Sequence, residues 1–489
     1  MKYKARLWLT LVLLFVPLAG WAQEKLARLP VSEKDVQRLL RTDFYGVYFL
    51  GKKVGWAKNA CARVERGPEA VYVNTEEFSF KLLVLGRKTE MRQLETFEFA
   101  AQPPYALRSA RSRESDGQTA KEITLSRNGQ VFEALIEAGG EKTRKRVGAL
   151  DYTLADLACV PVWIRRGPKL GESVTIRNFS LDDLKIHPEV HKLTATKRTK
   201  TQGVTVTYHE LEVTRPDECI KSVERYDESA DQVLSEVVRN LEFRVEPEKL
   251  AKNTEFSADL FELGKVRLNK ELGKSDHLTS LVVETLGKDD LRIKSGPRQS
   301  VTRNPSGTYT IKLGKAYGTP TRPTPRELED AQSETPDYPI SNPKIRALAQ
   351  QAVGDAATPR AKVERLVAFV HNYITPSYSA RPLTVLDLLK VRKGDCSNYA
   401  ALFTALARAA GIPARELGGL VYMGDDEKAF GFHAWNEVVL DGQWVPIDAT
   451  SGETDLKPTH ISYGSITGEQ SANFFESFGK LSLRLLEAK

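Results

Sequence analysis

The chain has 489 residues, of which 41% are hydrophobic, and a formal net charge of +7 at pH 7. This length suggests about three domains of roughly 100 to 200 residues, and the hydrophobic content is sufficient for ordinary cores. The small positive charge comes from a mixture of both signs, so it does not indicate nucleic-acid binding. Basic runs at 141–146 and 197–202 are interpreted as solvated surface.

The first 22 residues have the order of a secretory signal peptide. Basic residues in MKYKAR precede the apolar run LWLTLVLLFVPLAG, and small residues lead to an expected cleavage after Ala22. The alternative is an uncleaved membrane anchor, but an anchor needs about 20 apolar residues, and this run is shorter and contains Pro17. Cleavage removes Lys2, Lys4 and Arg6 and no acid, so the net charge falls from +7 to +4. We expect an exported, soluble protein, periplasmic or extracellular, without a membrane span.

The four cysteines, Cys61, Cys159, Cys219 and Cys396, lie far apart in the sequence. They show neither a CxxC pair nor a Cys/His metal spacing, so no metal site and no cofactor are expected. An exported protein can form disulfides. If two of the first three cysteines pair, one is left over and Cys396 can stay free, but the sequence does not fix the pairing.

Residues 23–253 are predicted to form a β-rich N-terminal domain with an antiparallel sheet and one or two helices. FYGVYFLGKKVGWAK reads as two short strands around Gly51-Lys52, and ITLSRNGQVFEALI carries Asn128-Gly129 between two alternating runs. Asn-Gly between such runs is a strong hairpin signal.

Three further segments follow. Residues 254–318 contain the strand candidates LTSLVVETL and GTYTIKL, which form either a small β domain or an extension of the first sheet. Residues 319–340 are rich in proline and disfavour both helix and sheet, so they are interpreted as a linker. Residues 341–489 form the last domain, in which helices come first and strands follow. Asn342-Pro343, Thr358-Pro359 and Thr384 are its expected helix starts.

Cys396 lies at the start of a predicted helix. From Tyr399 to Ala410 the apolar residues recur with helical spacing, Asp395 can cap the N-terminus, and Gly411 ends the helix. At this place the helix dipole and unpaired N–H groups favour a thiolate and could also receive a developing oxyanion. The competing interpretation is that Cys396 is a small buried hydrophobic residue.

A predicted hairpin in GFHAWNEVVLDGQWVPIDATSG supplies a base and a carboxylate. Its Asp441-Gly442 turn pairs residues whose numbers sum to 883, which makes His433 and Asp448 diagonal neighbours on one face. Such neighbours lie about 7 to 8 Å apart, within reach of an imidazole-to-carboxylate hydrogen bond. A lone His or Asp in a strand is usually structural, but the two together with Cys396 indicate a Cys-His-Asp arrangement for covalent acyl transfer.

The segment from about Ser341 to Gly464 resembles the transglutaminase-like core family, a papain-related α+β fold. The resemblance rests on GDCSNYA at a helix start, ARAAGIPAR at its end, FHAWNEV on one strand and WVPIDAT on the next. It implies an overall α+β fold in which the β-rich region precedes a papain-like core of helices followed by an antiparallel sheet. Cys396, His433 and Asp448 align with the family's catalytic triad; Ala449 stands where many relatives have proline. The exported β-rich region with this core also resembles bacterial envelope members.

Four other residues were weighed. Trp435 either shields the His433–Asp448 pair from water or is a plain core aromatic residue. Tyr378 is a candidate oxyanion donor, because family members often use an upstream side chain there. His371 is interpreted as structural, and His460 is assigned no role.

The expected function is that of a cysteine acyl-transfer enzyme of the cell envelope, which acts on peptide or amide bonds through a thioester. Hydrolysis is favoured over transamidation because nothing in the sequence specifies an amine acceptor. The expected partner is a peptide or protein substrate. The alternative function is a non-catalytic envelope module that binds peptides or organises partners.

Overall fold

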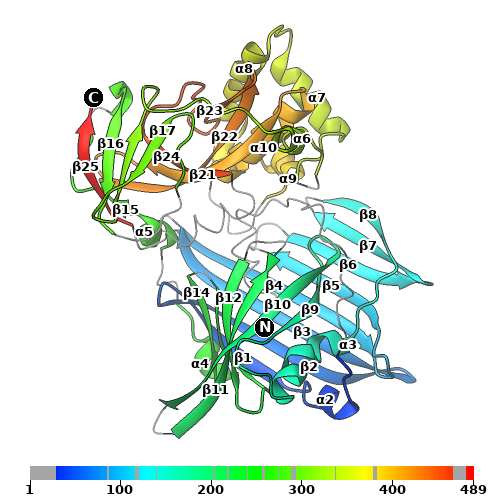
Figure 1. Cartoon of the computed structure of the whole chain (residues 1–489). Coiled ribbons are helices and arrows are strands. Elements are labelled where there is room, and N and C mark those ends of the chain that lie inside the picture. The colour runs from blue at the N-terminus through cyan, green and yellow to red at the C-terminus, as the bar shows by residue number, and fades with distance from the viewer. Residues whose placement is uncertain are drawn as a thin grey trace. The chain divides into compact units, whose positions relative to one another are not determined.

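The computed structural model describes residues 29–489 apart from 85–86, 116–119, 139, 202–203, 217–219, 239, 256–258, 274, 288–292, 336, 378–382 and 466–480. The chain divides into two compact units, and in the described part these are residues 29–259 and 260–489. Both consist of helices and sheets that are antiparallel apart from one two-stranded parallel sheet in the second unit (Figure 1), so the predicted α+β class is confirmed.

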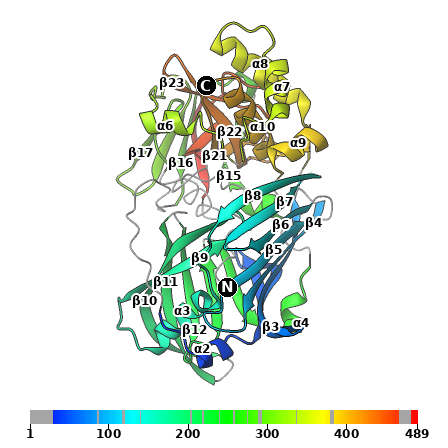
Figure 2. The same ribbon diagram turned by 90° about the vertical axis from the view of Figure 1, so that its right-hand side faces the viewer.

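The first unit is built on one sheet of fourteen strands, in which the described strand pairs are all antiparallel. Strands that follow one another in sequence are neighbours in the sheet, apart from β8 and β9, and the first strand also pairs with the last. The edges are therefore β8 and β9 (Figure 2). In chain order the strands are β1 (Thr42–Phe49), β2 (Lys52–Arg66), β3 (Glu69–Val84), β4 (Arg87–Ala100), β5 (Leu107–Ser115), β6 (Ala120–Asn128), β7 (Val131–Ala138), β8 (Glu141–Gly148), β9 (Ser173–Ser180), β10 (Lys185–Thr201), β11 (Val204–Arg215), β12 (Ile220–Asp227), β13 (Val233–Val238) and β14 (Leu241–Glu246).

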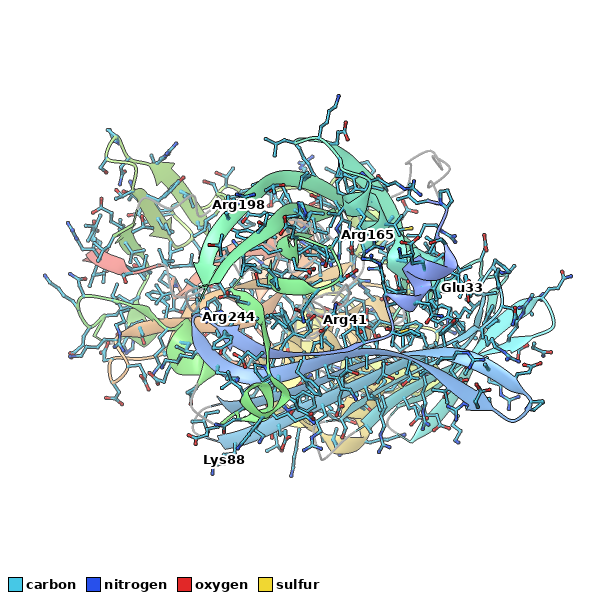
Figure 3. The ribbon with its side chains drawn as sticks, turned by 90° about the horizontal axis from the view of Figure 1, so that it is seen from below. Glu33, Arg41, Lys88, Arg165, Arg198 and Arg244 are labelled. Carbon is cyan, nitrogen blue, oxygen red and sulfur yellow. The ribbon has the colours of Figure 1, made fainter. Side chains whose placement is uncertain are left out.

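Three helices accompany this sheet: α2 (Glu33–Gln37), α3 (Leu154–Arg165) and α4 (Glu248–Lys252). Helix α3 connects the two edge strands, and its apolar residues join both core clusters of the unit. Leu154 packs with Phe99 and Phe179, whereas Trp163 packs with Leu211 and other residues of the later strands. Figure 3 shows Arg165 of α3 near the α2 helix that carries Glu33, and Arg165 pairs with Asp35 of that helix.

Two hairpins of this unit differ in detail from the sequence prediction. The segment around Gly51-Lys52 was predicted as two short strands, but β2 has 15 residues, and the turn residues are Leu50 and Gly51, both with positive φ. Tertiary pairing with β3 along twelve residues extends the strand beyond its local signal. The Asn128-Gly129 hairpin is present, but Asn128 pairs with Val131, so the turn residues are Gly129 and Gln130. Positive φ at Gly129 meets the demand of the first turn position.

The second unit contains a four-stranded sheet, a five-stranded sheet and a group of helices. In chain order its elements are α5 (Leu260–Gly264), β15 (Val266–Arg267), η2 (Ser275–His277), β16 (Leu281–Thr285), β17 (Gln299–Arg303), β18 (Tyr309–Leu313), α6 (Pro325–Asp330), α7 (Pro343–Val353), α8 (Pro359–Tyr373), β19 (Thr375–Pro376), α9 (Val385–Val391), β20 (Lys393–Gly394), α10 (Cys396–Ala409), β21 (Ala414–Tyr422), β22 (Ala429–Leu440), β23 (Gln443–Ile447), β24 (His460–Ser465) and β25 (Leu483–Ala488).

The strands at 281–285, 299–303 and 309–313 pair with one another and with β25, the last strand of the chain, and not with the fourteen-stranded sheet. The proline-rich segment 319–340 contains the short helix α6, which the composition argued against. Its first residue is Pro325, which is compatible with a first helical turn, and Thr324 with Glu327 forms a capping box. Local capping therefore outweighs the unfavourable composition.

Helices α7, α8 and α10 pack with strands β22 and β23 around one core. The predicted starts of α7, α8 and α9 are confirmed, because the side chains of Asn342, Thr358 and Thr384 each accept a hydrogen bond from a first-turn N–H. Among the described residues, no helix combines the length and the apolar composition needed to cross a bilayer.

Candidate active site

Cys396 is the first residue of α10, as predicted. The carboxylate of Asp395 accepts hydrogen bonds from the backbone N–H groups of Ser397 and Asn398, and the Asn398 side chain accepts one from the N–H of Asp395. This reciprocal cap fixes the first turn. The thiol is free and only partly buried, so it lies at a helix N-terminus with access to solvent. The positive end of the α10 dipole therefore lies next to the thiol.

The same cap narrows the expected oxyanion site. The sequence suggested that first-turn N–H groups could receive an oxyanion, but two of these groups already donate to Asp395. The backbone N–H of Cys396 itself remains as the candidate donor in this turn. Tyr378, the other candidate, lies outside the described residues, so its role as a donor stays a prediction.

The predicted hairpin is confirmed with its register. Strands β22 and β23 pair Asn436 with Ile447 and Leu440 with Gln443, as the sum of 883 requires. Asp441 and Gly442 both have positive φ, which is the signature of a type I′ turn. His433 therefore lies on β22, and Asp448 follows the last residue of β23.

The three predicted residues lie together. The Nε2 atom of His433 is 2.9 Å from Oδ2 of Asp448, and the side chain of Cys396 lies within hydrogen-bonding reach of the same imidazole. Because Nε2 faces the carboxylate, Nδ1 is the nitrogen left to face the thiol. The exposed fraction of the side chain is 10% for His433 and 1% for Asp448. The structure thus shows the order thiol, imidazole, carboxylate.

Burial and charge set the protonation of this pair. Burial by itself disfavours a charged imidazole, but the Asp448 carboxylate and the neighbouring Cys396 outweigh it and raise the pKa of His433 to about 10. Burial also disfavours the Asp448 carboxylate, yet His433 and His460 hold the pKa of Asp448 well below its ordinary value. The site therefore favours an imidazolium next to a carboxylate at neutral pH.

Asp448 is held by its own loop as well. Its Oδ1 accepts a hydrogen bond from the backbone N–H of Thr450 at 2.8 Å, and its Oδ2 accepts one from the hydroxyl of Ser451 at 2.8 Å. The ring of His371 on α8 contacts Gly452 and hydrogen-bonds to the carbonyl of Thr450 at 2.9 Å. His371 is thus structural, as interpreted, and it fixes the turn that orients the carboxylate.

His460 is the functional candidate that sequence reasoning missed. It begins β24, its side chain is buried, and its Nε2 lies 3.4 Å from Oδ2 of Asp448. The pairing of β24 with β21, which separates it from β22, brings it there. No local pattern reveals such a long-range pairing. The only available signal was the presence of a histidine in the last strand-like run of the core.

Trp435 is fully buried and contacts both histidines. Its ring stacks on His433 with centroids 5.9 Å apart, and it meets the His460 ring edge-on at 5.2 Å. Gly419 on the neighbouring strand makes room for it, since a Cβ there would lie 2.4 Å from the indole. The indole therefore covers the imidazole on one side, and the two interpretations of Trp435, core residue and shield, describe the same packing.

Asn436 connects the strand of His433 to the helix of Cys396. Its side-chain amide is buried and donates to the carbonyl of Ala400 at 3.0 Å and to the hydroxyl of Thr404 at 2.9 Å, both on α10. These bonds fix the helix against the strand and so set the distance between thiol and imidazole.

Two of the remaining cysteines are described, both in the first unit. Cys61 and Cys159 are buried, and Cys61 is a free thiol whose pKa burial raises to about 12. Cys219 lies outside the described residues, so its pairing is not tested.

His433, Asp448 and His460 also place three potential metal-ligand atoms within 4.8 Å of one another. Both imidazoles, however, direct Nε2 at the same carboxylate oxygen, Oδ2. Ligands of one metal ion would each direct a separate atom at the ion. The arrangement fits a carboxylate that orients two imidazoles better than a metal centre.

Residues 346–449 match the family model of the transglutaminase-like superfamily. This segment is about a fifth of the chain and includes Cys396, His433 and Asp448. The chain therefore carries a transglutaminase-like core, as the sequence motifs implied.

Individual relatives match over short stretches. Human kyphoscoliosis peptidase is 34% identical over 77 residues, which are 14% of this chain and 11% of the peptidase. The protein-glutamine gamma-glutamyltransferase of Pseudomonas aeruginosa is 34% identical over 139 residues, 25% of this chain and 20% of the transferase. The chain thus spans only a small part of either relative.

Among solved structures, a β-barrel-like domain of unknown function from Brucella abortus is 6% identical to this chain with a TM-score of 0.31. The match covers 42% of this chain and 94% of that one. So low a score supports no conclusion on function.

Proposed function

We propose that the protein is a cysteine acyl-transfer enzyme of the cell envelope that cleaves peptide or amide bonds through a thioester on Cys396. The observation that carries the proposal is the contact of Cys396, at the start of α10, with His433, which is hydrogen-bonded to the buried Asp448. Nucleophile, base and orienting carboxylate then stand in the order that covalent acyl transfer requires.

In the first half-reaction the thiolate of Cys396, whose proton is already on the His433 imidazolium, attacks the carbonyl carbon of the substrate. A C–S bond forms, and the carbonyl oxygen takes the negative charge, for which the N–H of Cys396 is the candidate donor. When the C–N bond breaks, the His433 imidazolium gives its proton to the leaving amine. The product is a thioester and a free amine.

In the second half-reaction His433 takes a proton from the incoming nucleophile, which attacks the thioester carbonyl and releases the thiol. Asp448 holds the ring so that one nitrogen faces the thiol throughout. Water gives a carboxylic acid, and a primary amine gives a new amide. We propose hydrolysis, since no feature of the described residues specifies an amine acceptor. One relative is named a peptidase and another a transferase, so the names of the relatives support either outcome.

The acceptor is identified by measuring how much of the acyl-enzyme reacts with water and how much with an added amine. The acyl-enzyme is formed from an active ester in the presence of increasing concentrations of a fluorescent primary amine, and the free acid and the amide are quantified. Hydrolysis predicts that the acid dominates at every amine concentration at which the enzyme stays active. Amide as the main product would make the protein a transamidase, with the same triad.

Location in the envelope is supported by the basic, apolar and small-residue order of residues 1–22. The test is expression of the whole chain in a Gram-negative host, followed by fractionation and intact-mass measurement. A periplasmic product that begins at Gln23 is expected. A full-length product in the membrane fraction would instead support an anchor.

Acylation itself is tested with p-nitrophenyl acetate and stopped-flow absorbance. We expect a burst of p-nitrophenol and an acetyl group on Cys396, located by peptide mass spectrometry. Cys396→Ala abolishes the burst, and Cys61→Ala, which removes a buried thiol from the other unit, leaves it unchanged. A burst that survives in Cys396→Ala, or its absence in the parent protein, would favour the non-catalytic peptide-binding module.

A further inference from the structure

Gln299 joins the two larger sheets of the second unit. It is the first residue of β17, an edge strand of the four-stranded sheet. Its side chain is bonded to Ser462 on β24, the edge strand of the five-stranded sheet. Gln299 is only 4% exposed, so this contact lies inside the unit. Ser462 is two residues along β24 from His460, which reaches the active site.

The Gln299 amide takes the place of a neighbouring strand. Its Oε1 accepts a hydrogen bond from the backbone N–H of Ser462 at 2.8 Å, and its Nε2 donates to the carbonyl of the same residue at 2.7 Å. Nε2 also donates to the carbonyl of Lys294 at 2.5 Å. The reverse orientation of the amide would set an oxygen against two carbonyls, so the hydrogen bonds fix its orientation. Both main-chain groups of Ser462 are thus paired, as a further strand would pair them.

The register of β24 depends on such a contact, because its pairing with β21 is irregular at this point. The register shifts by one residue directly after Ser462, which is a β-bulge. A bulge interrupts the ladder locally. A slip of β24 by one residue would turn His460 to the other face of the sheet and away from Asp448.

Two ion pairs at the same junction are weaker constraints. Asp455, in the loop between Asp448 and His460, pairs with Arg298 and Lys315. The side chains of Asp455 and Lys315 are exposed, and exposed ion pairs contribute little to stability. The buried amide of Gln299 is therefore the stronger constraint on this segment.

We propose that Gln299 is a positioning residue of the active site, which holds β24 in the register that brings His460 to Asp448. Nε2 of His460 lies 3.4 Å from Oδ2 of Asp448, and the same oxygen accepts the hydrogen bond of His433. A displaced β24 would lose the first of these bonds and keep the second. The importance for catalysis rests on the proposed function, but the contact of His460 with Asp448 can be measured without a substrate.

The test compares the mature parent protein with Gln299→Met, which keeps the size of the side chain and removes its hydrogen bonds. The first readout is the NMR titration of His433 with isotope-labelled histidine. Its pKa is expected to fall, because Asp448 is then held less firmly as a carboxylate. The second readout is turnover of p-nitrophenyl acetate. We expect kcat to fall by about tenfold at most with KM unchanged, since only one hydrogen bond transmits the effect.

A double-variant cycle separates positioning from a general loss of packing. The hydrogen bond from His460 to Asp448 is already absent in His460→Phe. Adding Gln299→Met to that variant is therefore expected to cause no further change in the His433 titration or in kcat. Independent effects of the two substitutions would instead add up.

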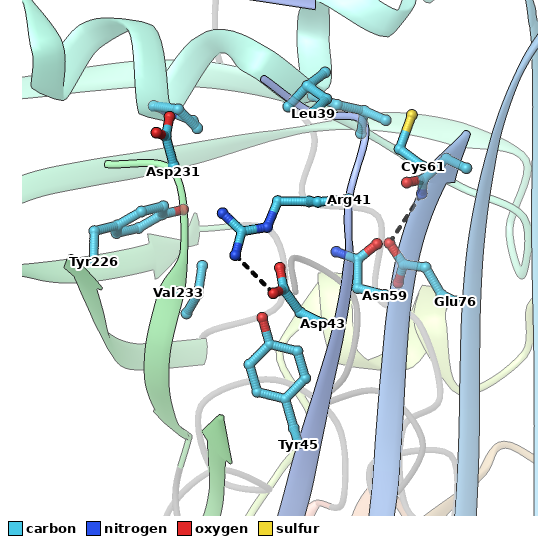
Figure 4. A pocket seen from close by; sticks show the side chains of 13 residues that line it. Leu39, Arg41, Asp43, Tyr45, Asn59, Cys61, Glu76, Tyr226, Asp231 and Val233 are labelled. Atoms are coloured by element: carbon cyan, nitrogen blue, oxygen red, sulfur yellow. Dashed lines mark hydrogen bonds and ion pairs between the residues drawn. The ribbon is translucent and has the colours of Figure 1, made fainter. Parts of the chain in front are cut away.

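Two control variants leave β24 in place. Asp455→Asn removes the exposed ion pairs of the same junction and is expected to change neither readout. Cys61→Ala enlarges a cavity of about 100 Å³ in the first unit (Figure 4), so it controls for a destabilising change outside the site. If Gln299→Met does not fold, Gln299→Asn takes its place, because it keeps an amide of shorter reach.

The proposal is overturned if His433 titrates in Gln299→Met as it does in the parent protein. It is also overturned if the two substitutions add up in the double variant, or if Asp455→Asn gives the same changes as Gln299→Met. A parent protein that does not turn over the ester would contradict the proposed function, and the NMR titrations alone would then decide the role of Gln299.

Discussion

Asp448 receives hydrogen bonds from His433 and from the loop that follows it. We predict that Asp448→Asn lowers kcat by about 10³- to 10⁴-fold, because an amide no longer stabilises the imidazolium and permits the wrong tautomer. Initial rates with an active-ester substrate give the value. The matched control is Glu453→Gln, which alters a carboxyl near the same turn and is expected to retain activity. A loss below tenfold in Asp448→Asn would contradict the assigned role.

His433 makes the stability of the protein depend on pH. Its pKa is about 10 in the folded protein against an ordinary 6.5, so the folded state binds the proton more tightly. The stabilisation is fully present below about pH 6.5 and is lost as pH rises toward 10. We predict that the free energy of unfolding in urea falls across this window more steeply in the parent protein than in His433→Gln. Parallel curves would contradict the raised pKa.

His460 is expected to position Asp448 and to take no part in proton transfer. Removing its hydrogen bond in His460→Phe costs about 1.5 kcal/mol, which corresponds to a roughly tenfold lower kcat/KM. His460→Gln retains a donor and is expected to restore most of the activity. The NMR titration of His433 is the second readout, and its pKa falls in His460→Phe only. Equal effects of both substitutions would indicate a packing role.

At the scale of elements, the site depends on the contact between α10 and β22. Asn436→Ala removes two buried hydrogen bonds to α10. We predict a loss of about 1 to 3 kcal/mol in the free energy of unfolding, together with a lower kcat, because helix and strand are no longer held in register. Thr404→Val removes one of these two partners and is expected to cost less. Urea denaturation and initial rates check both, and an unchanged kcat in Asn436→Ala would contradict a positioning role.

The elements of the core were predictable where local chemistry decides them. Asp395 as the cap of α10 and the Asp441-Gly442 turn each fix a start or a register within a few residues, so Cys396, His433 and Asp448 could be found from the sequence. Helix α6 was not predicted, because the proline-rich composition of residues 319–340 disfavours a helix although a capping box is present. The length of β2 was missed, because pairing with β3 and not local propensity sets it.

At the scale of the whole molecule, the missed features are all long-range. The pairing of β1 with β14 and of β25 with β16 joins segments about 200 residues apart, and no local pattern records it. The same holds for His460, which reaches Asp448 across the five-stranded sheet. On its own strand this histidine reads as an isolated polar position.

The central claim is that Cys396 and His433 act as a pair, and the most direct test is the rate of iodoacetamide alkylation of Cys396 against pH, followed by mass spectrometry on the mature protein. The parent protein, His433→Ala and the control His277→Ala, which changes an exposed histidine, are compared. We predict that alkylation of the parent and the control persists well below the free-thiol pKa of about 8.5 and that His433→Ala loses this advantage. An inert Cys396, or identical profiles in all three proteins, would contradict the pair and favour the binding module.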